Sequence, residues 1–182
     1  MMNRSIITAI VLLIISITNL YGQTKKSIYL GIQPSITVEP FYEEGELDIN
    51  VFPLIFETPI SQRINLRIVP MVNYHIGGVE NGISDLSVFT VLPFFLKKNE
   101  ENENVKPYGF YVGPVLGFGR NLINDHYTTT IALEPGYMWE AKKSFTITLG
   151  AQIGASYFGY DSKPNKWVLH WGPKVTFGFW IG

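Results

Sequence analysis

Cysteine is absent from the 182 residues of this sequence, and charged residues make up only 16% of it. Without cysteine the chain has no disulfide, thiol nucleophile, cysteine metal site or lipid-modified N-terminal cysteine. The formal net charge is −1, so no electrostatic argument favours a nucleic-acid partner. Hydrophobic residues reach 46%, which excludes a disordered tail. We therefore expect a folded chain of one domain, or at most two small ones.

Long apolar runs are also missing, apart from one near the N-terminus. Arg4 precedes an apolar stretch, 6–17, and the small residue Gly22 follows it. A basic start, a short apolar core and a small residue are the pattern of a secretory signal peptide. The stretch is shorter than the ~20 residues of a membrane-spanning helix, and an N-terminal anchor is the alternative. We expect residues 1–22 to be a cleaved signal peptide and residues 23–182 to form one domain.

Proline recurs at a near-regular interval, and each of the recurring prolines lies within an alternation of apolar and polar residues. Such alternation is the period of a β-strand, whereas proline removes a donor from the strand ladder. We therefore expect seven strands that are bulged or locally distorted, and an eighth, within 144–160, that has no proline. The recurring prolines are Pro34, Pro53, Pro70, Pro93, Pro114, Pro135 and Pro173.

The alternation predicts eight strands, near 28–38, 47–56, 64–75, 86–96, 108–119, 126–139, 145–157 and 167–181. In six of them one face is apolar and the other is polar or small. The strand at 47–56 is mixed, and we place Ile55 on the same face as Leu47 and Ile49. The strand at 86–96 is apolar on both faces, so its orientation is undecided.

Glycine indicates which face of these strands points inward. Ten of the eleven glycines within the strands share the polar face, where they make room in the narrow interior of an eight-stranded barrel. The bulky apolar face would then lie outside, which is stable in lipid but not in water. The sequence therefore predicts an all-β, eight-stranded antiparallel transmembrane β-barrel with a filled polar lumen. The ten glycines are Gly31, Gly109, Gly113, Gly117, Gly119, Gly136, Gly150, Gly154, Gly172 and Gly178.

Aromatic residues fall near both ends of the expected strands, as in the girdles of membrane barrels. With both termini in the periplasm, Tyr74, Tyr127, Tyr157 and Trp167 lie near the outer interface. The inner girdle would contain Tyr108, Tyr137, Trp139 and Phe145. Connections 40–46, 77–82, 120–125 and 161–165 would face outward, and 58–63, 97–106 and 140–143 would face the periplasm.

Signal peptide, eight alternating strands, inward glycines and aromatic girdles together resemble the small eight-stranded outer-membrane barrels of OmpA/OmpX architecture. The resemblance covers residues 23–182, and the segment 170–177 is similar to the terminal assembly signal of that family. It implies an integral outer-membrane location, contact with outer-membrane lipid and lipopolysaccharide, and insertion by the outer-membrane assembly machinery. It also implies a structural role that needs no cofactor.

Two groups of inward-facing residues are candidates for a site. His75, His126 and His170 fall on the outer half, where imidazoles with carboxylates suit zinc, copper or pH sensing; otherwise they are ordinary lumen residues. Near mid-height, Arg67, Glu134 and Lys174 form a candidate charge network. Charges so confined need partners, and we expect the network to plug the barrel.

We therefore expect a non-enzymatic structural or assembly-component role, not an open pore, with a possible protein partner in a larger envelope complex. A lipid A acyl hydrolase or acyltransferase is the alternative, although 126–129 lacks the serine and asparagine of the deacylase pattern. An acyltransferase could use Asp161 and Ser162. A second alternative is a soluble periplasmic, lipocalin-like ligand-binding barrel, in which the two faces would be reversed.

Overall fold

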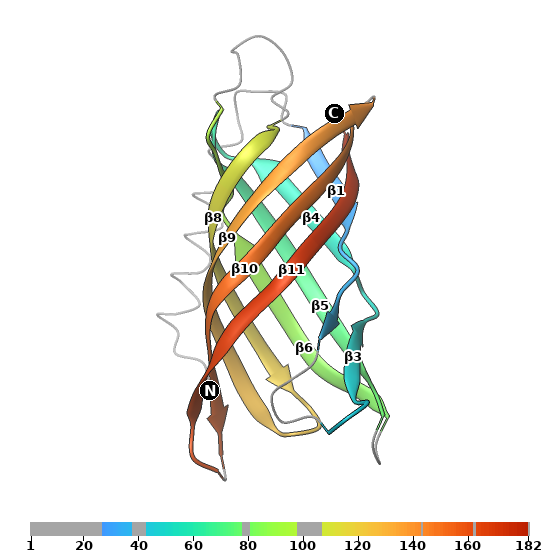
Figure 1. Cartoon of the computed structure of the whole chain (residues 1–182), viewed down its shortest axis with the longest axis vertical. Coiled ribbons are helices and arrows are strands. Elements are labelled where there is room, and N and C mark those ends of the chain that lie inside the picture. The colour runs from blue at the N-terminus through green and yellow to red at the C-terminus, as the bar shows by residue number, and fades with distance from the viewer. Residues whose placement is uncertain are drawn as a thin grey trace, which may run out of the picture.

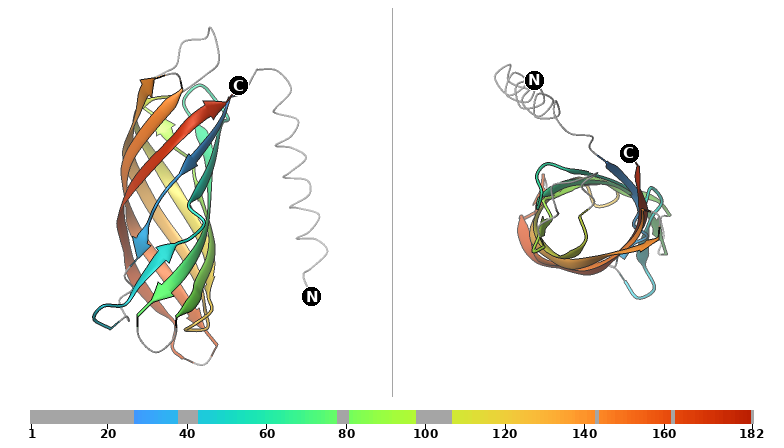
Figure 2. Two further views of the ribbon diagram at one scale, coloured as in Figure 1. Left: turned by 90° about the vertical axis from the view of Figure 1, so that its right-hand side faces the viewer. Right: turned by 90° about the horizontal axis from the view of Figure 1, so that it is seen from above.

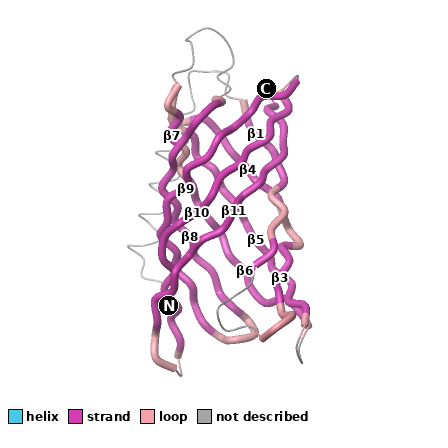
Figure 3. Tube along the Cα trace, viewed as in Figure 1, coloured by secondary structure: helices cyan, strands magenta, loops and turns pink. Residues whose placement is uncertain are grey.

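A computed structural model describes residues 27–37, 43–77, 81–97, 107–142, 144–161 and 163–181, with only the backbone at Thr37 and Lys142. The expected signal peptide and most of the connection 97–106 lie outside these residues. All regular secondary structure in the described part is β-strand, as Figure 3 shows. No helix there is long and apolar enough to cross a membrane.

Eleven β elements form the eight strands of the barrel wall (Figure 1). Three wall strands are each made of two elements, and the other five are continuous. The divided strands are β1 (Ile28–Ile32) with β2 (Ile36–Thr37), β3 (Leu47–Asn50) with β4 (Leu54–Pro59), and β6 (Gly82–Val91) with β7 (Phe94–Phe95). The continuous strands are β5 (Asn65–Ile76), β8 (Gly109–Asn121), β9 (His126–Lys142), β10 (Phe145–Tyr160) and β11 (Lys166–Ile181).

Neighbouring strands in the described wall pair antiparallel, and the wall strands follow one another around the ring in chain order. The ring closes where β1 pairs with β11, from Ile28–Ile181 to Ile32–Phe177. Figure 2 shows the ring from above. The expected eight-stranded antiparallel barrel is thus confirmed.

Proline affects the wall less than expected. Pro34, Pro53 and Pro93 lie in the three breaks between paired elements, where the prediction of distortion is right. Gln33 N–H donates to Pro53 O at 2.7 Å, so a proline carbonyl at a break still has a partner. The prediction is wrong for the other four prolines, because the strand containing each of them keeps its register with a neighbouring strand on both sides of the proline. These prolines are Pro70 in β5, Pro114 in β8, Pro135 in β9 and Pro173 in β11.

The wall strands alternate in burial as their sequences predict, with one correction. Ile55 is fully buried, so its placement with Leu47 on the outer face was wrong. The break around Pro53 reverses the alternation, because both Phe52 and Val51 are exposed there. The undecided strand directs Phe95 and Val91 inward. One of its apolar faces therefore points into the lumen, and the other points outward.

The sequence predicted a filled polar lumen, but the lumen is neither filled nor polar along its whole length. At the end where β1 begins and β11 finishes, an apolar cluster fills it; the opposite half holds a cavity of about 910 Å³. This cluster contains Tyr29, Ile55, Val69, Met71, Phe95, Tyr111, Met138 and Trp180. The alternation placed most of these residues inward, but it did not predict that they would gather in one half of the lumen and leave the other half unfilled.

Inward glycines make room for aromatic rings. A Cβ added at Gly136 would lie 2.5 Å from the ring of Tyr111, and one at Gly178 would lie 2.5 Å from the ring of Tyr29. Phe89 lies against Gly117 in the same way. The crowding predicted from glycine is confirmed at these positions, because a side chain there would need space that a ring occupies.

Large apolar side chains cover the outer face. Trp171, Leu169 and Phe110 are 71%, 68% and 64% exposed. Aromatic rings cluster at both ends of this face: Tyr157 lies 5.2 Å from Trp167, and Tyr137 lies 4.4 Å from Trp139 between ring centroids. The barrel therefore presents an apolar surface flanked by aromatic residues, which is the reverse of a soluble barrel.

Candidate functional site

A buried ion-pair network crosses the lumen beside the apolar cluster. Arg67, on β5, is 2% exposed and its Nε donates to Glu57 Oε2 at 2.6 Å. Its Nη1 donates to Glu134 Oε1 on β9 at 2.7 Å. Asn65 donates to the other oxygen of Glu57, and Tyr111 OH donates to Glu134 Oε1 at 2.8 Å. One guanidinium therefore links two carboxylates from opposite parts of the wall.

Glu134 also connects this network to the cavity. Its Oε2 accepts a hydrogen bond from Gln152 Nε2 at 2.6 Å. The Gln152 carbonyl oxygen must then face the other way, where it lies 3.0 Å from His170 Nε2. Because that oxygen can only accept, Nε2 carries the proton. In the neutral imidazole this leaves His170 Nδ1 as an acceptor.

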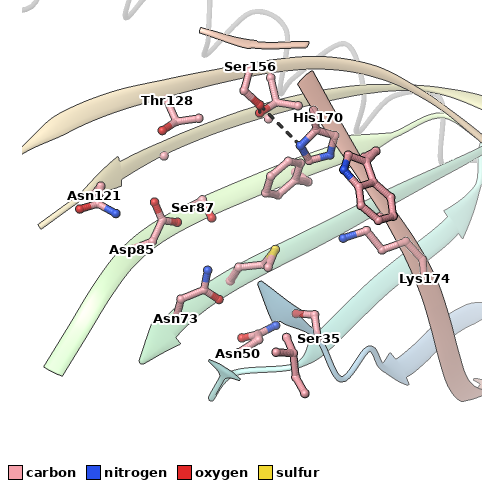
Figure 4. Close-up of a pocket in the computed structure, with 18 of the residues that line it drawn as sticks. Ser35, Asn50, Asn73, Asp85, Ser87, Asn121, Thr128, Ser156, His170 and Lys174 are labelled. Carbon is pink, nitrogen blue, oxygen red and sulfur yellow. Dashed lines mark hydrogen bonds between the residues drawn. The ribbon is translucent and has the colours of Figure 1, made fainter. Parts of the chain in front are cut away.

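Ser156 lies on the acceptor side of His170. Its Oγ is 3.5 Å from His170 Nδ1 and 2.7 Å from Thr130 Oγ1. Figure 4 shows the serine and the histidine facing each other across the cavity wall. The arrangement resembles a nucleophile next to an oriented base, with an amide in place of the usual carboxylate. It is the one feature of the described lumen with the geometry of a catalytic pair.

Lys174 differs from Arg67 because it has no salt bridge to any described residue. Its side chain extends from β11 into the cavity, as Figure 4 shows, and it contacts no carboxylate within 4.0 Å among the described residues. Asp85, Asn73 and Asn121 also line the cavity. Arg67 and Glu134 thus form the ion pair at the centre of the candidate network, and Lys174 remains an amine available to the cavity.

The other two histidines have separate surroundings. His75 Nδ1 lies 3.0 Å from Asp48 Oδ1, and Ser84 Oγ donates to Asp48 Oδ2 at 2.7 Å. His126 stacks between Phe158 and Tyr160, with ring centroids 4.7 and 4.8 Å away. Within the described ranges, no group of three histidine, aspartate or glutamate side chains is placed to hold a metal ion. Zinc binding by these histidines stays an untested alternative to their interpretation as ordinary lumen residues.

Sequence reasoning missed Glu57, Gln152 and Ser156. Glu57 follows the break at Pro53, where the alternation reverses, so its inward direction was not readable from the residues before it. Gln152 and Ser156 lie on the polar face of the strand predicted at 145–157, but their contacts with β11 depend on strand register. That register pairs Gln152 with Gly172 and Gly154 with His170.

Comparison with models of known protein families gives no match, and comparison with curated protein sequences gives none either. The fold and the lumen contacts are therefore the basis for everything proposed below.

Proposed function

We propose that this chain is an integral outer-membrane protein whose barrel crosses the bilayer with both termini in the periplasm. The exposed apolar face carries this proposal. In water such a surface would promote aggregation, whereas in hydrocarbon it is the stable arrangement for a closed barrel. The 16 residues of β11 span roughly 40 Å of height at a tilt of ~40°, enough for an apolar band ~25 Å tall.

The role that fits the lumen is structural or that of an assembly component, without steady ion conduction. Arg67, Glu57 and Glu134 are all buried and paired, and the apolar cluster fills the lumen beside them. Opening a path there would separate charges in a narrow, weakly hydrated space. This role also includes contact with lipid and lipopolysaccharide, and a protein partner in a larger envelope assembly.

Heat-modifiable gel mobility after refolding into phosphatidylcholine vesicles tests the membrane proposal. We expect the unheated protein to migrate as a compact band and the boiled protein as a slower one, with the protein floating with the vesicles. A single band at all temperatures, with the protein remaining in the soluble fraction, would contradict the proposal. That outcome would favour the soluble ligand-binding barrel instead.

A second candidate function is acyl-ester chemistry on a lipid, supported by the Ser156–His170 pair. His170 Nδ1 could take the serine proton as Oγ attacks an ester carbonyl, and the imidazolium would return that proton to the alcohol oxygen as the ester C–O bond breaks and the alcohol leaves. The acyl group would then pass from Ser156 to water, which releases the free acid, or to another lipid hydroxyl, which forms a new ester. Mass spectrometry of lipid A from cells that express the wild type or Ser156→Ala tests this candidate. Loss of an acyl chain that depends on Ser156 would establish the enzyme, and identical lipid A in both strains would exclude it.

A further inference from the structure

The wall has a seam between the first and the last strand. β1 pairs with β11 only through Ile32–Phe177, and β2 pairs with β3 alone. Just beyond the pairing, Thr176 Oγ1 still donates to Gln33 Oε1 at 3.5 Å. In the described part of the wall, no backbone hydrogen bond joins residues 33–37 to residues 172–176.

The space around two glycines also differs between the paired and the unpaired part of these two strands. A Cβ at Gly178, in the paired part, would lie 2.5 Å from Leu30 O across the pair. A Cβ at Gly172, four residues past Thr176 along the seam, would meet no atom within 4 Å. Pro34 and Pro173 lie on the two sides of the seam and neither can donate to a ladder. The sequence therefore weakens pairing at this position of the wall.

The cavity lies directly behind the seam. Pro34, Ser35 and Ile36 line it from one side, and residues 171–175 line it from the other. Its walls combine apolar groups such as Phe89 and Phe158 with the amine of Lys174, which has no carboxylate within 4.0 Å among the described residues. At about 910 Å³ the cavity has room for one acyl chain and its headgroup.

We propose that this cavity binds one long-chain carboxylate from the bilayer, which enters through the seam and pairs its headgroup with Lys174. The carboxylate supplies the negative charge that this amine lacks, and its oxygens can accept from groups at the unpaired strand edges. The alkyl chain passes between Ile36 and Trp171 toward hydrocarbon. This inference rests on the proposed membrane location, because the ligand comes from the lipid.

Two engineered cysteine pairs test the seam, and the cysteine-free chain makes them the only thiols present. The first pair is Gln33→Cys with Thr176→Cys, at the point where the two strands still touch. The second pair is Thr37→Cys with Gly172→Cys, four residues farther along the same register. A disulfide needs Cα atoms closer than about 7 Å. We expect mild oxidation in vesicles to join the first pair and leave the second reduced, whereas equal oxidation of both would overturn the open seam.

Native mass spectrometry of the protein released from micelles tests the ligand, with palmitate as the probe and methyl palmitate as its uncharged control. We expect one palmitate per chain, and binding weaker by about tenfold or more for methyl palmitate and for Lys174→Met. Lys174→Arg should retain the binding because it keeps the positive charge. Equal binding of both probes, or no saturable binding of palmitate, would overturn the proposal.

The compact, heat-modifiable band serves as the control for each protein used. A wild type that fails to enter vesicles contradicts the proposed membrane function itself. A wild type that enters vesicles but does not distinguish palmitate from its methyl ester contradicts the ligand proposal alone. If Lys174→Met fails to fold, the comparison of the two probes on the wild type still decides the proposal.

Discussion

Replacing Arg67 with methionine should destabilise the barrel severely. The guanidinium lies 2.6 Å from Glu57 and 2.7 Å from Glu134, and all three side chains are buried. Methionine retains much of the volume but leaves two buried carboxylates without a cation. Removing one partner of a buried ion pair costs about 3–5 kcal/mol. With an unfolding slope of about 2 kcal/mol per molar urea, the midpoint should fall by about 2 M.

Urea unfolding in phosphatidylcholine vesicles, followed by tryptophan fluorescence and by the fraction of compact band, measures this change. The matched control is Arg120→Met, because Arg120 pairs with Asp125 at 3.1 Å on the exposed surface. We expect the control to leave the midpoint within error of the wild type.

A triple variant separates charge from packing. Adding Glu57→Gln and Glu134→Gln to Arg67→Met removes the uncompensated charges, and we expect most of the lost stability to return. Equal urea midpoints for Arg67→Met and Arg120→Met would contradict a stabilising role of the buried ion pairs. A triple variant no more stable than Arg67→Met alone would contradict the role of uncompensated charge.

Three further predictions follow from the lumen. Gly136→Ala places a methyl group 2.5 Å from the ring of Tyr111 and should cost about 1–3 kcal/mol of unfolding free energy, whereas Gly172→Ala should be neutral in the same titration. In planar bilayers the wild type should give no steady conductance steps; reproducible steps would contradict the plug. Because the histidines have separate surroundings, calorimetry should give the same zinc heat for the wild type and for the variant with all three replaced by alanine.

Most of the wall was predictable from the sequence because strand period and face chemistry agree along it. Along β9, for example, Tyr127, Leu133 and Trp139 alternate with small and polar inward residues. The prediction failed at Ile55, because the break around Pro53 reverses which of the following residues point into the lumen. The burial of Phe95 also escaped it, since the strand at 86–96 is apolar on both faces.

The site was less predictable than the wall. Arg67 and Glu134 were recognised as inward charges, but the partnership of Arg67 with Glu57 needed three-dimensional placement. The contact between Ser156 and His170 depends on the register of β10 against β11, which alternation does not specify. The cavity arises from volumes that side chains do not fill and from a seam between strands that are remote in sequence.

Fluorescence quenching of two tryptophans in lipid tests directly whether the outer face of the barrel contacts the bilayer. Trp171 is 71% exposed on the outer face, whereas Trp180 is 4% exposed within the lumen. Single-tryptophan proteins that keep one or the other, with phenylalanine at the remaining positions, are refolded into vesicles whose acyl chains carry bromine. For a barrel that spans the bilayer we expect strong quenching of Trp171 and little quenching of Trp180. Equal quenching of the two, or none of Trp171, would contradict an outer face in contact with lipid.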